Sequence, residues 1–270
     1  MGAFMRRLID FPCAGVTLAG TLDEGPGDTG LLIVSGGNEI RMGAHRGMAM
    51  LAQRVAAEIG APVFRFDRRG IGDSTGENRG FENSVEDIAA AAATFMAEAP
   101  GVRRLVAFGN CDAATALALF HQVAGVDALL LANPWVIEHS DELPPTAAIR
   151  ARYAERLRDP TQWLRLATGG VNLVKLAKGL TKISKKVSEV KDSLAMRMAD
   201  ALASSETPIT ILLARGDNTA IAFADAWQDT RFDRARAHVH IRQCETASHS
   251  FAHPADKQWL FERVAEALAG

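Results

Sequence analysis

Short apolar runs alternate with longer segments of helical periodicity along most of the chain. The apolar runs predict buried strands at residues 31–35, 62–66, 104–108, 127–132, 209–214 and 238–242. Residues 7–22 predict two further strands around Gly15. Helices are predicted between the strands at 48–60, 84–99, 111–123, 219–228 and 256–269. This alternation implies right-handed crossovers, so we predict an α/β fold with a mostly parallel central sheet and helices on both faces.

One predicted helix end and one predicted helix start carry additional sequence signals. Gly60 is expected to end the helix that precedes it. Ser84 is predicted as an N-cap with Asp87 three residues later, an aspartate variant of the capping box.

The stretch from about Glu138 to Ser205 departs from the alternation and contains no convincing strand. Between Arg150 and Arg197, twelve Lys and Arg residues outnumber four Asp and Glu residues, which gives a local charge of +8. We interpret the stretch as a helical insertion over the carboxyl ends of the strands, where ligands bind in open α/β sheets. The predicted organisation is a core of residues 1–137 and 206–270 with a helical lid, or cap, at 138–205.

Residues 173–190 of this insertion predict an amphipathic basic helix, weakened near Gly179. Its apolar residues recur at three- and four-residue steps: Leu173, Leu176, Leu180, Ile183, Val187 and Val190. Lysines occupy other positions: Lys175, Lys178, Lys182, Lys185 and Lys186. One interpretation is a lid with its apolar face over a pocket and its lysines in water. In the other, the lysines attract an anionic membrane surface or a phosphate-bearing acyl carrier.

Composition narrows the class of protein. Apolar residues make up 48% and charged residues 23% of the 270 residues, an ordinary globular balance. The net charge of −2 argues against nucleic acid as a partner. No apolar run approaches the roughly 20 residues of a membrane-spanning helix, and the start of the chain lacks the apolar region of a secretory signal. The wide spacing of Cys13, Cys111 and Cys244 suits a reducing compartment. We expect a cytoplasmic protein, and its oligomeric state stays open.

The segment around Cys111 is the most informative for chemistry. A predicted strand runs through Gly109, Asn110, Cys111, Asp112 and Ala113 directly into a helix. A nucleophile elbow has this layout, because a sharp strand-to-helix turn between small residues projects one side chain above the sheet. The helix N-terminus favours the thiolate, which is the reactive form of cysteine. The alternative is an ordinary buried cysteine.

Two later positions fit the other members of a catalytic triad. Asp217 follows the predicted strand at 209–214, and His249 lies in the loop before the last predicted helix. The chain order is then nucleophile, acid and histidine, the order of α/β-hydrolases. His253 precedes Pro254 at the predicted helix start, where a capping or surface role is expected. Asn133 follows another strand, but an amide cannot stabilise an imidazolium as a carboxylate does, so Asp217 is the candidate acid.

An acyl-transfer site also needs hydrogen-bond donors for an oxyanion. One candidate is the backbone N–H of Asp112, the residue after the nucleophile. The second is the N–H of Gly37, with Asn38 next, in the glycine loop after the predicted strand at 31–35. The alternative is a simple glycine turn.

Several other patterns lead to no site. Residues 25–30 match G-x-G-x-x-G but precede a strand, so we interpret them as a turn. His238 and His240 alternate on one strand with nothing near them in sequence to complete a metal site. We therefore expect neither a cofactor nor a metal. The Asp67–Ser74 segment is expected to be a tight structural turn that braces the site.

Taken together, SGGNEIRMGAHRG, FRFDRRGIGDSTGE, GNCDAA and GDNTA resemble the α/β-hydrolase superfamily over nearly the whole chain. More narrowly, they resemble the hydrolases encoded beside bacterial exosortase A systems, the subgroup called exosortase A system-associated hydrolase 1. The resemblance implies the α/β-hydrolase fold with a lid, and a setting of exopolysaccharide production and sorting of surface-anchored proteins. The cysteine elbow is also similar to that of dienelactone hydrolases, which use a Cys-Asp-His triad, although the last elbow position here is Ala113 and not glycine.

These observations lead to one hypothesis and two alternatives. In the hypothesis, Cys111 attacks an ester or thioester carbonyl, His249 serves as base and then acid, and Asp217 orients the imidazole. An acyltransferase would use the same triad and pass the acyl group to another alcohol or amine. A non-catalytic module would keep the fold and bind an acyl ligand without forming an acyl-cysteine.

Overall fold

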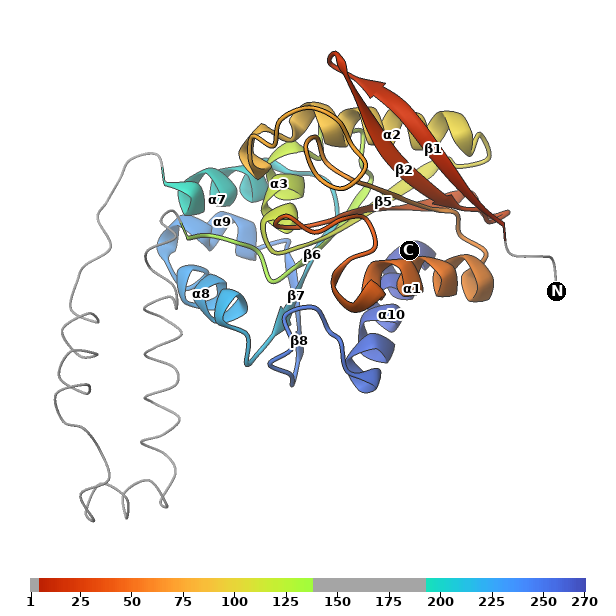
Figure 1. The fold of residues 1–270 in the computed structure, drawn as a ribbon. Coiled ribbons are helices and arrows are strands. Elements are labelled where there is room, and N and C mark those ends of the chain that lie inside the picture. The colour runs from red at the N-terminus through yellow and green to blue at the C-terminus, as the bar shows by residue number, and fades with distance from the viewer. Residues whose placement is uncertain (1–4, 138–192) are drawn as a thin grey trace, which may run out of the picture.

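The computed structural model describes residues 5–137 and 193–270, which build an eight-stranded sheet flanked by helices (Figure 1). Across the sheet the strands run in the order β1-β2-β4-β3-β5-β6-β7-β8. Their bounds are β1 Arg6–Cys13, β2 Val16–Asp23, β3 Thr29–Val34, β4 Val63–Phe66, β5 Arg104–Asn110, β6 Ala128–Ala132, β7 Ile209–Ala214 and β8 His240–Cys244. The β1–β2 and β2–β4 pairs are antiparallel, and all remaining pairs are parallel. The prediction of a mostly parallel sheet is confirmed.

Most helices lie where the apolar spacing predicts them, but the short helix Asp233–Arg236 was not predicted. Their bounds are α1 Gly47–Arg54, α2 Val85–Glu98, α3 Asp112–Phe120, α7 Leu194–Ser204, α8 Asn218–Ala226, α9 Asp233–Arg236 and α10 Pro254–Ala269. A π-helical turn, η2 Val55–Ile59, extends α1 as far as Gly60, whose left-handed φ of 80° ends it as predicted. Shorter 3-10 turns lie at η1 Ala44–Arg46, η3 Phe81–Asn83 and η5 Thr230–Phe232.

The parallel strands β3 to β7 are buried on both faces, whereas the edge strand β8 is largely exposed, so the sheet separates two apolar cores. On one face, α1, η2 and α10 pack their apolar sides against the strands through Leu51, Val55, Leu260 and Val264. On the other face, α2, α3, α7, α8 and α9 cover the sheet (Figure 1). Continuous apolar runs such as β6, in which every residue is buried, are the sequence signature of this double coverage.

The range predicted as a lid lies mostly outside the described residues. The basic amphipathic segment at 173–190 is among those that the structure does not describe, so the lid and its membrane or carrier alternatives stay predictions. The last part of the range is described. It forms α7, whose Met198, Ala199 and Leu202 are buried in the core beside α3.

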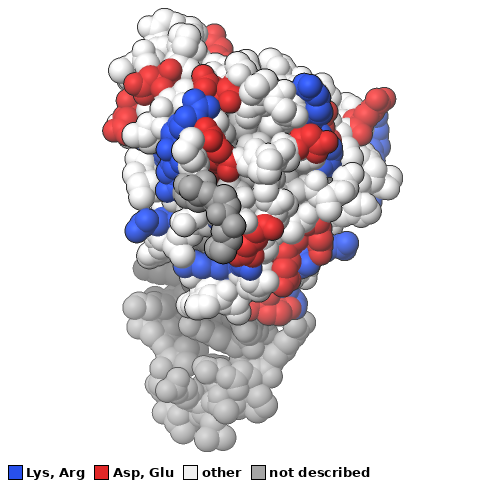
Figure 2. Space-filling model, turned by 90° about the vertical axis from the view of Figure 1, so that its right-hand side faces the viewer, with Lys and Arg blue, Asp and Glu red and all other residues white. Residues whose placement is uncertain are grey.

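On the face shown in Figure 2, basic and acidic side chains are interspersed, with no extended surface of one sign among the described residues. Within 5–137 and 193–270, no helix is long and apolar enough to cross a membrane.

The predicted capping box at the start of α2 is wrong. Ser84 occupies the N-cap position, but its hydroxyl donates a hydrogen bond to the Phe81 carbonyl (2.6 Å) and caps no N–H of α2. Asp87 is buried, and its carboxylate accepts from the backbone N–H (2.9 Å) and Nε (2.7 Å) of Arg69. The aspartate therefore joins α2 to the turn after β4, because a buried carboxylate needs a charged partner more than the helix needs a cap.

His121 joins the end of α3 to the residue after α7 and is almost fully buried. Its Nδ1 lies 3.2 Å and 3.1 Å from the carbonyls of Leu117 and Ala118, and its Nε2 lies 2.8 Å from the Ser205 hydroxyl. Burial lowers the pKa of His121, against the opposing effect of the two carbonyls. The neutral imidazole thus donates through Nδ1 and accepts through Nε2.

This arrangement predicts a pH-dependent contribution to stability. Because the folded-state pKa is lowered, the unfolded chain binds a proton at this histidine more readily, and the stabilisation is lost as pH falls below about 6.5. The free energy of unfolding, measured by urea denaturation at pH 7.5 and pH 5.5, should fall less in His121→Gln than in wild type. His240→Gln, at an exposed position, is the control. Equal losses in His121→Gln and wild type would contradict the assignment.

Candidate active site

Cys111 forms the junction between β5 and α3 in a strained backbone conformation. Its φ is 61° and its ψ is −127°, values that cost a non-glycine residue about 1–3 kcal/mol. The Cys111 N–H donates to the Ala132 carbonyl at 2.9 Å, which ties the turn to the end of β6. The side chain thus leaves the sheet at the carboxyl end of β5, as a nucleophile elbow requires.

Small residues on both sides of Cys111 make the turn possible. A Cβ at Gly109 would lie 2.9 Å from the backbone carbonyl of Ala113, so strand and helix approach too closely for any side chain there. Ala113 is fully buried, and its methyl group fits where many elbows have glycine. A Cβ at Gly36 would lie 2.3 Å from the Asn110 carbonyl and 3.3 Å from the Cys111 Cβ. The loop after β3 therefore lies directly against the elbow.

The structure brings Asp217 and His249 together. Nδ1 of His249 lies 2.9 Å from Oδ2 of Asp217. The same carboxylate oxygen accepts from the N–H groups of Thr219 and Ala220, both at 3.0 Å, so Asp217 also caps α8. These three donors fix the carboxylate at the carboxyl end of β7 and leave the second nitrogen of the imidazole for another partner.

That partner is Cys111, and Asp217 and Cys111 together raise the pKa of the histidine. Burial alone would lower the pKa of His249, but hydrogen bonds to Asp217 and to Cys111 outweigh it and raise the pKa to about 10. Asp217 and Cys111 therefore both stabilise the protonated form of the imidazole. His253, by contrast, is exposed at the start of α10, where its side chain caps no N–H of the helix.

Two of the residues predicted to supply oxyanion donors, Gly37 and Asp112, are in contact, and the contact has a feature that the sequence does not reveal. The Gly37 N–H donates to Oδ1 of Asp112 at 2.6 Å, so a side chain occupies this donor in the structure. The Asp112 N–H belongs to the first turn of α3, where N–H groups lack partners within the helix. The side chain of Asn38 is exposed and accepts from Asn78 at 2.9 Å.

Arg68 supports this corner of the site from the turn after β4. Its Nη2 donates to the Gly37 carbonyl and lies 3.6 Å from Oδ2 of Asp112. The guanidinium is almost fully buried, and its Nε has no hydrogen-bond partner among the described residues. Arg68 thus holds both the glycine loop and the Asp112 carboxylate.

The Asp67–Ser74 turn has the bracing contacts expected of it. The buried Asp67 carboxylate accepts from the N–H groups of Arg41 (2.5 Å) and Asp73 (3.1 Å) and pairs with the Arg41 guanidinium. Ser74 donates to the Asp67 carbonyl at 2.6 Å. These contacts fix the loop that carries Gly37 relative to β4.

The sequence assigned no role in the site to two residues that contact the catalytic candidates. The amide groups of Asn110 and Asn133 both donate to the His249 carbonyl, at 3.1 Å and 3.0 Å. The sequence carries one signal for each, since Asn110 lies inside the elbow and Asn133 at a strand's carboxyl end. It does not show that the two side chains meet.

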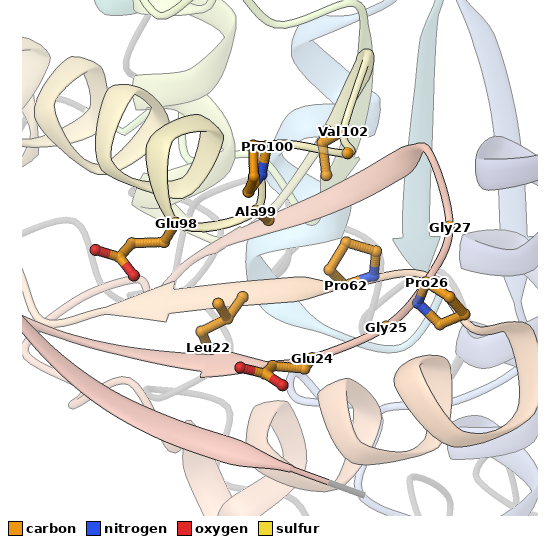
Figure 3. Close-up of a pocket in the computed structure, with 11 residues that line it drawn as sticks. Leu22, Glu24, Gly25, Pro26, Gly27, Pro62, Glu98, Ala99, Pro100 and Val102 are labelled. Atoms are coloured by element: carbon orange, nitrogen blue, oxygen red, sulfur yellow. The ribbon is translucent and has the colours of Figure 1, made fainter. Parts of the chain in front are cut away.

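A surface depression elsewhere on the molecule lies apart from this site. It is formed by the predicted glycine turn before β3 and by residues just before β4 and β5, including Pro62, Pro100 and Val102 (Figure 3). These residues are at the amino ends of the parallel strands, the edge of the sheet opposite Cys111.

Among the described residues, no group of three or more His, Cys, Asp and Glu side chains is arranged to hold a metal ion.

Comparisons with known proteins identify the fold. No protein-family model and no curated protein sequence matches the chain significantly. Among solved structures, the chain is similar to an esterase from Pyrococcus furiosus, Pf2001, with a TM-score of 0.67 and 16% identity over 98% of this chain and 92% of that chain. It is also similar to the α/β hydrolase GrgF from a Penicillium species, with a TM-score of 0.63 and 17% identity over 98% of both chains.

A putative aryl esterase from Burkholderia cenocepacia matches with a TM-score of 0.59 and 15% identity over 98% of this chain and 100% of that chain. These likenesses show that the chain has the α/β-hydrolase fold.

The close approach of Gly36 to the elbow predicts that the position tolerates no side chain. Gly36→Ala should lower the free energy of unfolding by about 1–3 kcal/mol, because the methyl group would overlap the Asn110 carbonyl. Gly101→Ala is the matched control, since a Cβ there meets nothing within 4 Å. The measurement is urea unfolding of both variants and wild type. Equal stability of the two variants would show that the loop does not lie against Cys111.

Proposed function

We propose that this protein is a hydrolase of acyl esters or thioesters that forms an acyl-cysteine intermediate on Cys111. The observation that carries the proposal is the position of His249, which is hydrogen-bonded to Asp217 on one side and to Cys111 on the other. A nucleophile, a histidine and a carboxylate in one hydrogen-bonded row are the parts of a catalytic triad. The esterase and hydrolase neighbours share the fold on which such a row is built.

The protonated His249 favours attack by a thiolate. In the proposed attack, the proton of the Cys111 thiol is held by His249 while the sulfur adds to the acyl carbon, and the carbonyl electrons move to the oxygen. When the tetrahedral adduct collapses, the bond to the leaving group breaks. The leaving alcohol or thiol takes the proton from His249, whose neutral ring stays oriented by Asp217.

The N–H groups of Asp112 and Gly37 are the proposed oxyanion donors. Because Gly37 donates to the Asp112 carboxylate in this structure, the acyl oxygen has to displace that carboxylate to reach the donor. Arg68, next to both residues, keeps a cation beside the displaced carboxylate.

Deacylation reuses the same groups in reverse. A water molecule loses a proton to neutral His249 and adds to the acyl carbon. The carbon–sulfur bond then breaks, which releases the carboxylic acid and restores the thiolate beside the protonated histidine.

The sequence resemblance to exosortase A-associated hydrolases adds a physiological setting to this proposal. We propose a role beside exopolysaccharide production and surface-protein sorting, acting on an acyl-bearing substrate. The basic segment at 173–190, with its lysine-rich composition, would attract an acidic carrier or membrane surface.

The triad assignment predicts a ranking of variants. Cys111→Ala and His249→Ala should abolish turnover of chromogenic acyl esters, whereas His253→Ala should stay within threefold of wild type. Asp217→Asn should lower kcat by about three to four orders of magnitude, because the amide loses the charge that stabilises the imidazolium. Initial rates over a graded series of chain lengths, for oxygen and thioesters, give the measurement.

Asp217→Asn is informative because asparagine caps helices about as well as aspartate, so α8 should remain intact. Thermal unfolding of each variant checks this. If kcat falls less than tenfold in Asp217→Asn, another residue is the acid of the triad. If His253→Ala has a larger effect than His249→Ala, His249 is not the base.

A further inference from the structure

Asn133 is a fully buried polar residue at the carboxyl end of β6, in the middle of the sheet. Its φ of 43° is in the left-handed region, which asparagine tolerates better than most residues. Its backbone N–H donates to the Leu212 carbonyl of β7 at 2.8 Å. A buried amide at this position needs partners for two N–H groups and one oxygen.

All the polar atoms of this side chain are engaged. Nδ2 donates to Oδ1 of Asn110 and to the His249 carbonyl, both at 3.0 Å, and Oδ1 accepts from the Ala214 N–H at 2.8 Å. The opposite orientation of the amide would place its oxygen against two acceptors. The contacts therefore allow one orientation only.

Each contact leads to a different member of the proposed triad. Asn110 is the residue before Cys111, Ala214 ends the strand that leads to Asp217, and the third partner is His249 itself. Asn110 adds a second donor to the His249 carbonyl at 3.1 Å. Two side chains thus hold the backbone of the histidine loop against the ends of β5, β6 and β7.

We propose that Asn133, with Asn110, is a positioning residue that holds the backbone of His249 so that its imidazole spans Asp217 and Cys111. The inference rests on the proposed function, in which that imidazole relays the proton. Neither asparagine contacts the reacting atoms. A displacement of about 1 Å can cost on the order of a hundredfold in rate. The two hydrogen bonds to the His249 carbonyl should therefore have a large effect on turnover.

The test measures Cys111 itself, so it requires no knowledge of the substrate. Iodoacetamide alkylates thiolates, and a cysteine without a neighbouring cation is almost entirely a thiol at pH 6. The test compares the alkylation rate of Cys111 at pH 6 with that at pH 8.5 in wild type and in each variant, because a cation held beside a thiol favours the thiolate. Peptide mass spectrometry separates Cys111 from the two buried cysteines, Cys13 and Cys244.

Asn133→Gly removes the amide and keeps a residue that tolerates the positive φ. Its alkylation rate at pH 6 should fall at least tenfold, and the rate at pH 8.5 should stay within threefold of wild type. For an acyl ester that wild type hydrolyses, kcat should fall about a hundredfold with little change in KM.

Ser205→Ala is the matched structural control, because it removes a buried hydrogen bond, to His121, outside the triad. It should lower stability and leave the alkylation profile of Cys111 unchanged. If Asn133→Gly does not fold, Asn110→Ala removes one of the two donors to the His249 carbonyl and should shift the profile in the same direction.

The proposal would be overturned if the folded Asn133→Gly variant showed the same pH dependence of Cys111 alkylation as wild type. A loss of Cys111 reactivity by the same factor at all pH values would also overturn it. If the proposed function is wrong, wild type itself will hydrolyse no acyl ester. The pH dependence of Cys111 alkylation will still report the position of His249, so the two failures can be told apart.

Discussion

The positive φ of Cys111 is the constraint on which the rest of the site depends. The strained turn projects the thiol above the sheet, and it persists because its surroundings leave no alternative. Gly109 and Ala113 let β5 and α3 meet closely, and Gly36 brings the glycine loop against the Asn110 carbonyl. The hydrogen bond from the Cys111 N–H to Ala132 ties the turn to the next strand. The same geometry thus presents the nucleophile and brings a candidate oxyanion donor beside it.

The partners of Cys111 come from distant parts of the chain, and parallel strand ends bring them together. Asp217 follows β7 and His249 follows β8, so both reach the same edge of the sheet as the elbow. Asn133, at the end of β6, lies between them and contacts all three segments. His249 is further fixed by its own loop, because Phe251 is buried with a φ of 52° and stacks on Trp259 of α10.

Much of the fold was predictable from sequence because each element carries a local signal. Apolar runs specify the strands, helical spacing specifies the helices, and small residues around Cys111 indicate the elbow. Contacts between side chains from separate elements were less accessible. The Ser84 and Asp87 spacing suggested a capping box, yet Asp87 pairs with Arg69 from another element. Likewise, nothing local to Asp112 indicates that its carboxylate occupies the Gly37 N–H, or that Asn110 and Asn133 meet at His249. Such contacts follow from strand order, which a single sequence specifies only indirectly.

If Cys111 is the nucleophile, it becomes acylated during turnover, and intact-mass spectrometry of the protein detects that intermediate. Wild type and Cys111→Ala are mixed with acyl esters and acyl thioesters of graded chain length and quenched at early times. We expect a mass increase equal to one acyl group on wild type only, which appears before steady-state turnover and decays as substrate is exhausted. Turnover without such an increase, or the same increase on Cys111→Ala, would contradict it.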